Sequence, residues 1–214
     1  MTTETAVDIW VPDGYSQMPL SDIDQKIDIA ASLFDTLPAS DFKTGCLAIM
    51  PAAATLLKGL VERDARYCGI GRHLSSSGEL VTSCLTVCVY ETGGEKLNPR
   101  LVLKELVESR LATDEPAGQM ELMEVDGRPI LFSERISELP TPELPGIPYI
   151  AETTATYQLE ALVSAPDGTA LAAIELSTAA VDAGPEFRKM IADMARSIAF
   201  RPSDHPSSTS WLQI

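Results

Sequence analysis

The chain offers few side chains that could act as nucleophiles, general bases or metal ligands. Its 214 residues include only two histidines, His73 and His205, and four cysteines. A Ser/His/Asp or Cys/His site would have to use His73, because His205 falls in a polar tail, and no motif near His73 supports one. The sequence also lacks a phosphate-binding loop, a dinucleotide-binding glycine motif and a G-x-S-x-G motif. We therefore predict a protein that is not an enzyme, with no catalytic residue and no cofactor.

The four cysteines, Cys46, Cys68, Cys84 and Cys88, follow neither zinc-ribbon nor redox-pair spacing. Cys84 and Cys88 lie in TSCLTVCVYE, which alternates as a β-strand does. On a strand they share a face but stand roughly 13 Å apart. That distance is too long for a disulfide and for one zinc ion. We expect buried, reduced thiols and no metal site.

Acidic residues outnumber basic ones 31 to 16, so the formal net charge is −15. Such a surface repels the phosphates of nucleic acids and of anionic lipids, and it attracts a basic partner. Solubility alone would also account for the charge. We therefore expect no nucleic-acid partner, and a protein partner of basic character.

No segment predicts a secreted or membrane location. Residues 1–10, MTTETAVDIW, hold two acids and no basic or long apolar stretch. The most apolar segment, Cys46–Val61, is interrupted by a proline, a threonine and a lysine and is too short to span a bilayer. We expect a cytoplasmic protein with no membrane partner.

Apolar spacing predicts two helices and three strands in the first part of the chain. One helix is expected over Asp22–Leu37, with Ser21 as its N-cap. Pro51 suits a first helical position, which predicts a second helix over Ala52–Arg66 and leaves Gly45–Met50 open between strand and helix. The strands expected here are Asp8–Val11, Tyr67–Leu74 and Leu80–Glu91.

The later part of the chain has the pattern of hairpins closed by a helix. Asn98-Pro99 marks a helix start. Asp126-Gly127 is the strongest hairpin signal, and Pro166-Asp167-Gly168 marks a second turn. The strands and final helix expected are Met120–Val125, Ile130–Ile136, the two halves of Tyr157–Thr178, and Pro185–Phe200.

Strands that come as hairpins, rather than alternating with helices, favour an antiparallel sheet. We predict an α+β fold with an antiparallel sheet of about six or more strands flanked by helices. Residues 1–202 are expected to form a single domain, and residues 203–214 a flexible polar tail.

Two segments are candidates for contact with another protein. Leu139–Pro148 is rich in proline and must run extended, either as a stiff loop or as a ligand for an aromatic groove. The tail ends in an apolar stretch that would dock on the domain or on another chain. The candidate partner-binding residues are Pro140, Pro142, Pro145, Trp211, Leu212 and Ile214.

Four stretches resemble an actinobacterial family of uncharacterised function. They are IWVPDGYSQMPL, TSCLTVCVYE, TYQLEALVSAPDGTALAAIELST and EFRKMIADMARSIAF, and the resemblance extends to about residue 202. Such proteins are similar to the PsbP-like and LpqN-like α/β sandwich. The resemblance implies an antiparallel sheet packed between helices and a mostly non-enzymatic role in binding, assembly or cofactor handling, in association with secretion or toxin systems. This chain departs from the LpqN-like lipoproteins in showing no lipobox.

The sequence thus favours a non-enzymatic protein-binding protein, such as a cargo chaperone or an immunity protein that masks a basic toxin. The alternative is a small-ligand carrier with a pocket between sheet and helices. An enzyme comes third, and it would require a buried acid or histidine at the base of a polar cleft.

Overall fold

A computed structural model of the chain describes residues 5–93, 96–112, 118–141 and 151–202. Within these ranges seven strands form one antiparallel sheet: β2 (Tyr15–Gln17), β3 (Ala65–Leu74), β4 (Leu80–Glu91), β5 (Gln119–Val125), β6 (Arg128–Pro140), β7 (Thr153–Ser164) and β8 (Ala170–Thr178). Their order across the sheet is β2-β3-β4-β8-β7-β6-β5. The helices described are α1 (Ile23–Asp35), α2 (Asp41–Glu62), α3 (Pro99–Ala112) and α4 (Arg188–Ser197).

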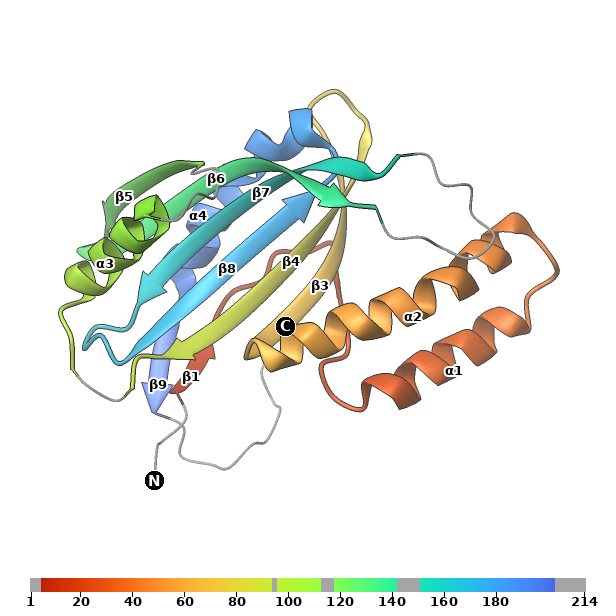
Figure 1. Cartoon of the computed structure of the whole chain (residues 1–214), viewed down its shortest axis with the longest axis horizontal. Helices are drawn as coiled ribbons and strands as arrows, with labels where there is room; N and C mark the ends of the chain where they lie inside the picture. Colours follow the sequence, from red (N-terminus) through yellow and green to blue (C-terminus); the bar gives the residue numbers. More distant parts are fainter. Residues whose placement is uncertain (1–4, 94–95, 113–117, 142–150, 203–214) are drawn as a thin grey trace.

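The helices cover the sheet unequally. Helix α4 lies on one face, and α1, α2 and α3 lie on the other (Figure 1). This arrangement confirms the predicted α+β class with an antiparallel sheet between helices. The strands expected before and after both hairpin turns are also confirmed.

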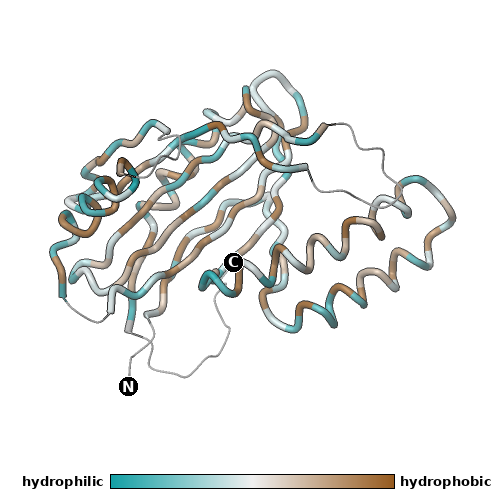
Figure 2. Tube along the Cα trace, in the orientation of Figure 1, coloured by the Kyte–Doolittle hydropathy of each residue, from teal (hydrophilic) through white to brown (hydrophobic). Residues whose placement is uncertain are grey.

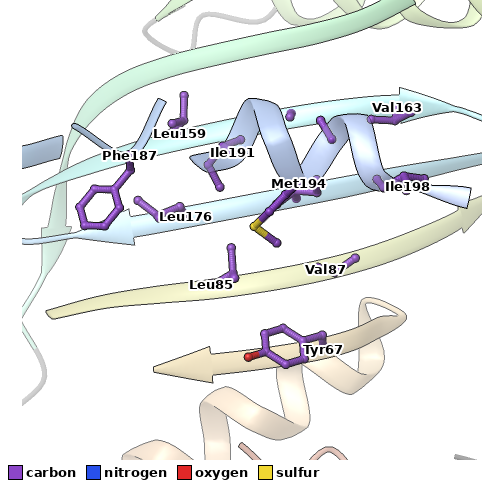
Figure 3. Packing of buried hydrophobic residues seen from close by; sticks show 14 of the residues in the cluster. Tyr67, Leu85, Val87, Leu159, Val163, Leu176, Phe187, Ile191, Met194 and Ile198 are labelled. Carbon is purple, nitrogen blue, oxygen red and sulfur yellow. The ribbon is translucent and has the colours of Figure 1, made fainter. Parts of the chain in front are cut away.

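The larger core lies between the sheet and α4. Helix α4 presents Ile191 and Met194 to the sheet, where Leu85, Leu176 and Leu159 project from aligned positions on three neighbouring strands (Figure 3). Burial of each such side chain contributes about 1.5–3 kcal/mol. This layer therefore fixes which face of every strand points toward α4, and it leaves the opposite face for the other helices.

Turn chemistry explains why the hairpins form where the sequence places them. Asp126 and Gly127 both adopt positive φ, 51° and 76°, as a two-residue type I′ turn requires. Gly168 has φ of 71° in the turn between β7 and β8. At the start of α3, the side-chain oxygen of Asn98 accepts a hydrogen bond from the N–H of Arg100 at 2.9 Å, as expected for a cap.

Helix α2 is longer than the sequence predicted. It begins at Asp41, well before the expected start near Pro51, and it includes Gly45–Met50. Ser40 is its N-cap, because the Ser40 hydroxyl accepts a hydrogen bond from the N–H of Lys43 at 3.2 Å. Proline is favoured at a helix start. Here the helix instead passes through Pro51 and loses one backbone hydrogen bond.

The C-terminal elements correct two further predictions. In place of one helix over Pro185–Phe200, the chain forms the 3-10 helix η1 (Val181–Phe187), then α4, then strand β9 (Ala199–Pro202). Strand β9 pairs antiparallel with β1 (Thr5–Asp8), which lies earlier than the expected Asp8–Val11. The partner of β9 is almost a whole chain away, so local helical spacing could not reveal the strand.

The predicted N-cap of α1 is also wrong. Asp22, rather than Ser21, is the cap residue, with left-handed φ and ψ of 51° and 37° and no side-chain capping bond. The Ser21 hydroxyl instead accepts a hydrogen bond from Nζ of Lys26 at 3.3 Å. The start of α1 is therefore set by the backbone turn.

Candidate functional site

The sheet face opposite α4 is covered only at its two ends. Helix α2 packs Leu57 and Leu60 against Cys68 at one end, and α3 packs Leu103 against Leu131 at the other. Between these helical covers lies a groove of about 490 Å³. Its walls are the C-terminal parts of α2 and α3, and its floor is formed by β4, β8, β7 and β6.

Two polar rows cross the floor of the groove. One row of aligned residues is Thr86, Glu175, Glu160 and Ser133. The row beside it is Cys84, Ser177, Gln158 and Arg135. On the other side, the row that runs from Cys88 to Leu131 is apolar and lies beneath α3. The floor therefore becomes polar at the point where the helical cover ends.

Two arginines, one from each helical cover, hold the two carboxylates of the floor. Glu160 and Glu175 lie directly opposite each other on β7 and β8. Arg110, in the last turn of α3, donates two hydrogen bonds to Glu160, one of them at 2.9 Å. Arg63, at the end of α2, donates to Glu175 at 3.2 Å, and the Glu175 carboxylate raises the pKa of Arg63. This network spans the groove and ties both helices to the sheet.

A third arginine, Arg135, also lines the groove. It donates from Nε to the side-chain oxygen of Gln158 at 2.6 Å. Among the residues that the structure describes, the lining holds three arginines and two glutamates.

The cysteines lie differently from what the sequence predicted. Cys68 and Cys88 are buried, but Cys46 and Cys84 are partly exposed, and all four are free thiols. Cys84 lines the groove beside Cys68 of the next strand. A hydrogen bond between these two thiols lowers the pKa of Cys84 and raises that of Cys68. Among the described residues, no three His, Cys, Asp or Glu side chains are grouped as metal ligands.

His73 lies on the α4 side of the sheet, away from the groove. Its ring centroid is 4.9 Å from that of Tyr15 and 5.3 Å from that of Phe187. Burial lowers the pKa of His73. These aromatic neighbours fit a packing role rather than the base of a catalytic triad.

The α1–α2 hairpin carries a second candidate site, an apolar surface open to solvent. Figure 1 shows the hairpin extending beyond the edge of the sheet, and Figure 2 shows hydrophobic residues recurring along both helices. Phe42 is 67% exposed and Leu33 is 65% exposed. Two exposed apolar residues lie four positions apart on α1, Leu37 follows just beyond its end, and Phe42, Ile49 and Leu56 recur every seven positions on α2. These residues, referred to below as the hairpin surface, are Ile29, Leu33, Leu37, Phe42, Ile49 and Leu56.

Helix α2 has the length and composition of a membrane span. An 18-residue window reaches a mean hydropathy of 1.5, and 11% of that window is buried. Its C-terminal part nevertheless packs on the sheet through Leu57 and Leu60. Lys58 also forms an ion pair with Asp24 of α1 at 2.7 Å. We therefore interpret α2 as a helix anchored at one end that presents apolar side chains to solvent.

Of the partner-binding residues expected from the sequence, only Pro140 is described. It is the last residue of β6, where it pairs with Thr153, and Leu139 also belongs to this strand. The expected extended loop therefore starts later than Leu139. The others, Pro142, Pro145, Trp211, Leu212 and Ile214, lie outside the described residues.

Neither candidate site was found by sequence reasoning. The hairpin surface had a visible signal, because no charged residue occurs between Lys43 and Lys58. The groove had none, because its floor depends on the register of four strands.

The sequence matches no family model and no curated protein. A function is therefore inferred from the chain's own residues, and membership of a PsbP-like family stays a prediction.

Proposed function

We propose that this protein is a non-enzymatic accessory protein that binds another protein through the hairpin surface. The observation that carries the proposal is the exposure of α2, an apolar helix of 22 residues of which little is buried. Among the described residues, the core between sheet and α4 contains no side chain of α2. Large exposed apolar patches are rare on monomeric soluble proteins and mark interaction sites.

The charges around the hairpin surface favour a basic partner. Residues 22–62 contain six acids and three lysines, and the whole chain carries −15. Two copies of such a chain repel each other, and so do the chain and an anionic membrane. A basic amphipathic helix would cover the apolar stripes with its apolar side and pair its lysines or arginines with the surrounding acids.

A hollow of about 460 Å³ lies along the N-terminal half of α2, beside Leu47 and Pro51. At about 3.6 residues per turn these two positions lie on the opposite side of α2 from Phe42 and Ile49, so the hollow is separate from the hairpin surface. A secreted cargo with a basic helix and a basic toxin both present the chemistry that would suit the hairpin surface.

Site-specific photo-crosslinking from position 49 in the native host tests the proposal. We expect one covalent adduct with a different, basic protein. The two proteins, purified and mixed, should form a 1:1 complex by light scattering. Phe42→Glu should weaken that complex about thirtyfold or more, as loss of a central apolar contact does. Leu74→Glu is the matched control, because Leu74 is equally exposed but lies on β3 away from the hairpin.

Three outcomes would contradict the proposal. An adduct of twice the chain's own mass would show that a second copy covers the surface. Flotation of the purified chain with neutral lipid vesicles would show a membrane occupant. Equal losses of binding in the Phe42→Glu and Leu74→Glu variants would show that the partner docks elsewhere.

A further inference from the structure

We propose that Cys84 and Cys68 form a thiol pair that a hydroperoxide converts to a disulfide. The bond would join β4 to β3 on the sheet face that the C-terminal end of α2 covers. Neither thiol belongs to the hairpin surface. The proposal rests on strand register, on contact between the two thiols, on their unequal exposure and on the helix that packs against them.

Strand register brings the two cysteines together. Cys68 lies directly opposite Thr86, and Cys84 lies two positions from Thr86 along β4. Side chains two positions apart on a strand share a face, so the two cysteines are diagonal neighbours on one face of the sheet. The Cys68 thiol donates a hydrogen bond to Cys84, and both side chains belong to the cluster beneath α2. They are far apart in sequence, so motif spacing did not reveal the pair.

Cys84 is the thiol that meets the oxidant. It is partly exposed, whereas Cys68 is only 1% exposed. The hydrogen bond from Cys68 lowers the pKa of Cys84, and burial and the Glu175 carboxylate oppose this shift without reversing it. The thiolate, rather than the thiol, is the form that is oxidised. Exposure and ionisation therefore both select Cys84 for the first step.

The reaction needs one hydroperoxide and no other co-reactant. The Cys84 thiolate attacks the terminal oxygen of R–OOH, the O–O bond breaks, and the leaving alkoxide takes up a proton to become R–OH. Cys84 is then a sulfenic acid. The Cys68 sulfur attacks the Cys84 sulfur, the S–O bond breaks, and hydroxide leaves as water with the proton of the Cys68 thiol. Two thiols and R–OOH thus give a disulfide, R–OH and water.

The span of the pair predicts a bond that is readily reduced. Diagonal neighbours in an antiparallel sheet stand roughly 7–8 Å apart between Cα atoms. Disulfides usually span about 4.4–6.8 Å. The bond must therefore draw β3 and β4 together locally, and a disulfide that departs from its preferred span is easier to reduce. Such a bond suits reversible oxidation rather than a structural cross-link.

The pair also lies where the helical hairpin is attached to the sheet. Leu57 and Leu60 of α2 and Ile23 of α1 form one buried cluster with Cys68. Protein interiors are close-packed, so displacement of a buried thiol removes contacts from its neighbours. Oxidation should therefore loosen the C-terminal end of α2 on the sheet.

Treatment of the purified full chain with hydrogen peroxide, followed by peptide mass spectrometry, tests the proposal. We expect a disulfide between Cys68 and Cys84 in the wild type, which dithiothreitol returns to two thiols. This measurement needs no variant, so it decides the matter even if a variant fails to fold by circular dichroism. Cys84→Ala should leave Cys68 reduced. Cys68→Ala should stop at the sulfenic acid of Cys84, which dimedone labels.

Cys88 is the matched control. It lies on the same strand and face as Cys84, two positions from Thr86 on the other side, but it is fully buried. Burial also raises the pKa of Cys88. Cys88→Ala should therefore change neither the rate of oxidation by hydrogen peroxide nor the product.

Hydrogen–deuterium exchange of the reduced and oxidised wild type follows the effect on α2. We expect faster exchange after oxidation in the peptide that holds Leu57 and Leu60. Exchange in α4 should stay the same, because α4 packs on the other face of the sheet.

Several results would overturn the assignment. A wild type that stops at the sulfenic acid, with Cys68 still a free thiol, would show that the two sulfurs cannot reach each other. A disulfide between Cys68 and Cys88 would show that the wrong diagonal pair was chosen. Oxidation of Cys68 in the Cys84→Ala variant would show that the oxidant enters elsewhere. Equal exchange of α2 in both redox states would show that the pair does not act on the attachment of the helix.

Discussion

Glu160 and Glu175 face each other across β7 and β8, and each is held by an arginine from a different helix. The pair lies at the centre of the sheet face that the helices leave open. Because Arg110 belongs to α3 and Arg63 ends α2, the two carboxylates connect both helical covers to one point of the sheet. The charge network therefore adds to the apolar packing that already holds α2 and α3 on the sheet.

Removal of Arg110 should destabilise the fold. The Glu160 side chain is only 18% exposed, so Arg110→Gln would leave a shielded carboxylate beside Glu175 without compensation. We expect urea unfolding at pH 7 to show a loss of about 1–2 kcal/mol. Adding Glu160→Gln should recover most of that loss. Arg100→Gln, in an exposed pair, should change stability by less than about 0.5 kcal/mol, and an equal loss in both variants would contradict the role of the network.

Two glycines should respond to alanine in opposite directions. A Cβ at Gly184 would lie 2.2 Å from the ring of buried Tyr157, whereas a Cβ at Gly59 in α2 meets nothing within 4 Å. Gly184→Ala should therefore cost about 1–3 kcal/mol through overpacking. Gly59→Ala should stabilise by roughly 0.5–1 kcal/mol through helix propensity. Urea denaturation measures both, and a tolerated Gly184→Ala would contradict the close packing of η1 on β7.

Mild acid should weaken the fold through His73. Among the described residues, Nε2 of His73 is buried without a hydrogen-bond partner, and burial lowers the pKa of His73 from 6.5. The unfolded chain therefore binds this proton at higher pH than the folded chain does. Stability should be fully present above about pH 6.5 and should fall as the pH drops below that value.

His73→Phe isolates this effect, because phenylalanine keeps the ring contacts and cannot take up a proton. The free energy of unfolding of the wild type should decline between pH 7 and 5.5 in urea titrations. The decline should be smaller in the variant. Parallel curves for the two proteins would mean that another group is responsible.

Local patterns predicted the elements that short segments encode. The turn at Asp126-Gly127 and the alternation of Leu80–Glu91 each depend on neighbouring residues, so β4 was predicted to the residue and β5 to within one residue, while β6 extends beyond the expected Ile130–Ile136 at both ends. The prediction for Ala199–Pro202 failed because a distant segment decides its structure. Strand β9 forms because it pairs with β1. The sequence does not reveal this pairing, so the predicted helix Pro185–Phe200 extended into β9.

The groove lies beyond sequence reasoning for the same reason. Glu160 and Glu175 are ordinary acids in strands, and only the hairpin register places them side by side. Arg63 and Arg110 reach them from helices that are remote in sequence. The hairpin surface differs, because an uncharged helix of this length is visible in the sequence. The sequence does not predict that only the C-terminal end of α2 packs on the sheet.

Cys84 should be more reactive than Cys68 and Cys88. It lines the groove, and the hydrogen bond from Cys68 lowers its pKa. That same hydrogen bond raises the pKa of Cys68, and burial raises the pKa of Cys88. Because the thiolate is the reactive form, iodoacetamide at pH 7.5 should label Cys84 before the other two, as peptide mass spectrometry can follow.

The Cys68→Ala variant shows whether Cys68 controls the acidity of the Cys84 thiol or the access of the reagent to it. Without the hydrogen bond, the pKa of Cys84 should rise, and labelling at pH 7.5 should slow by up to about tenfold because less of the thiol is ionised. In a pH–rate profile the midpoint should move to higher pH while the plateau at high pH stays the same. Cys88 lies four residues from Cys84 on the same strand, and Cys88→Ala should change neither the midpoint nor the plateau of the profile. A changed plateau with an unmoved midpoint would mean that Cys68 controls access to Cys84 rather than its acidity.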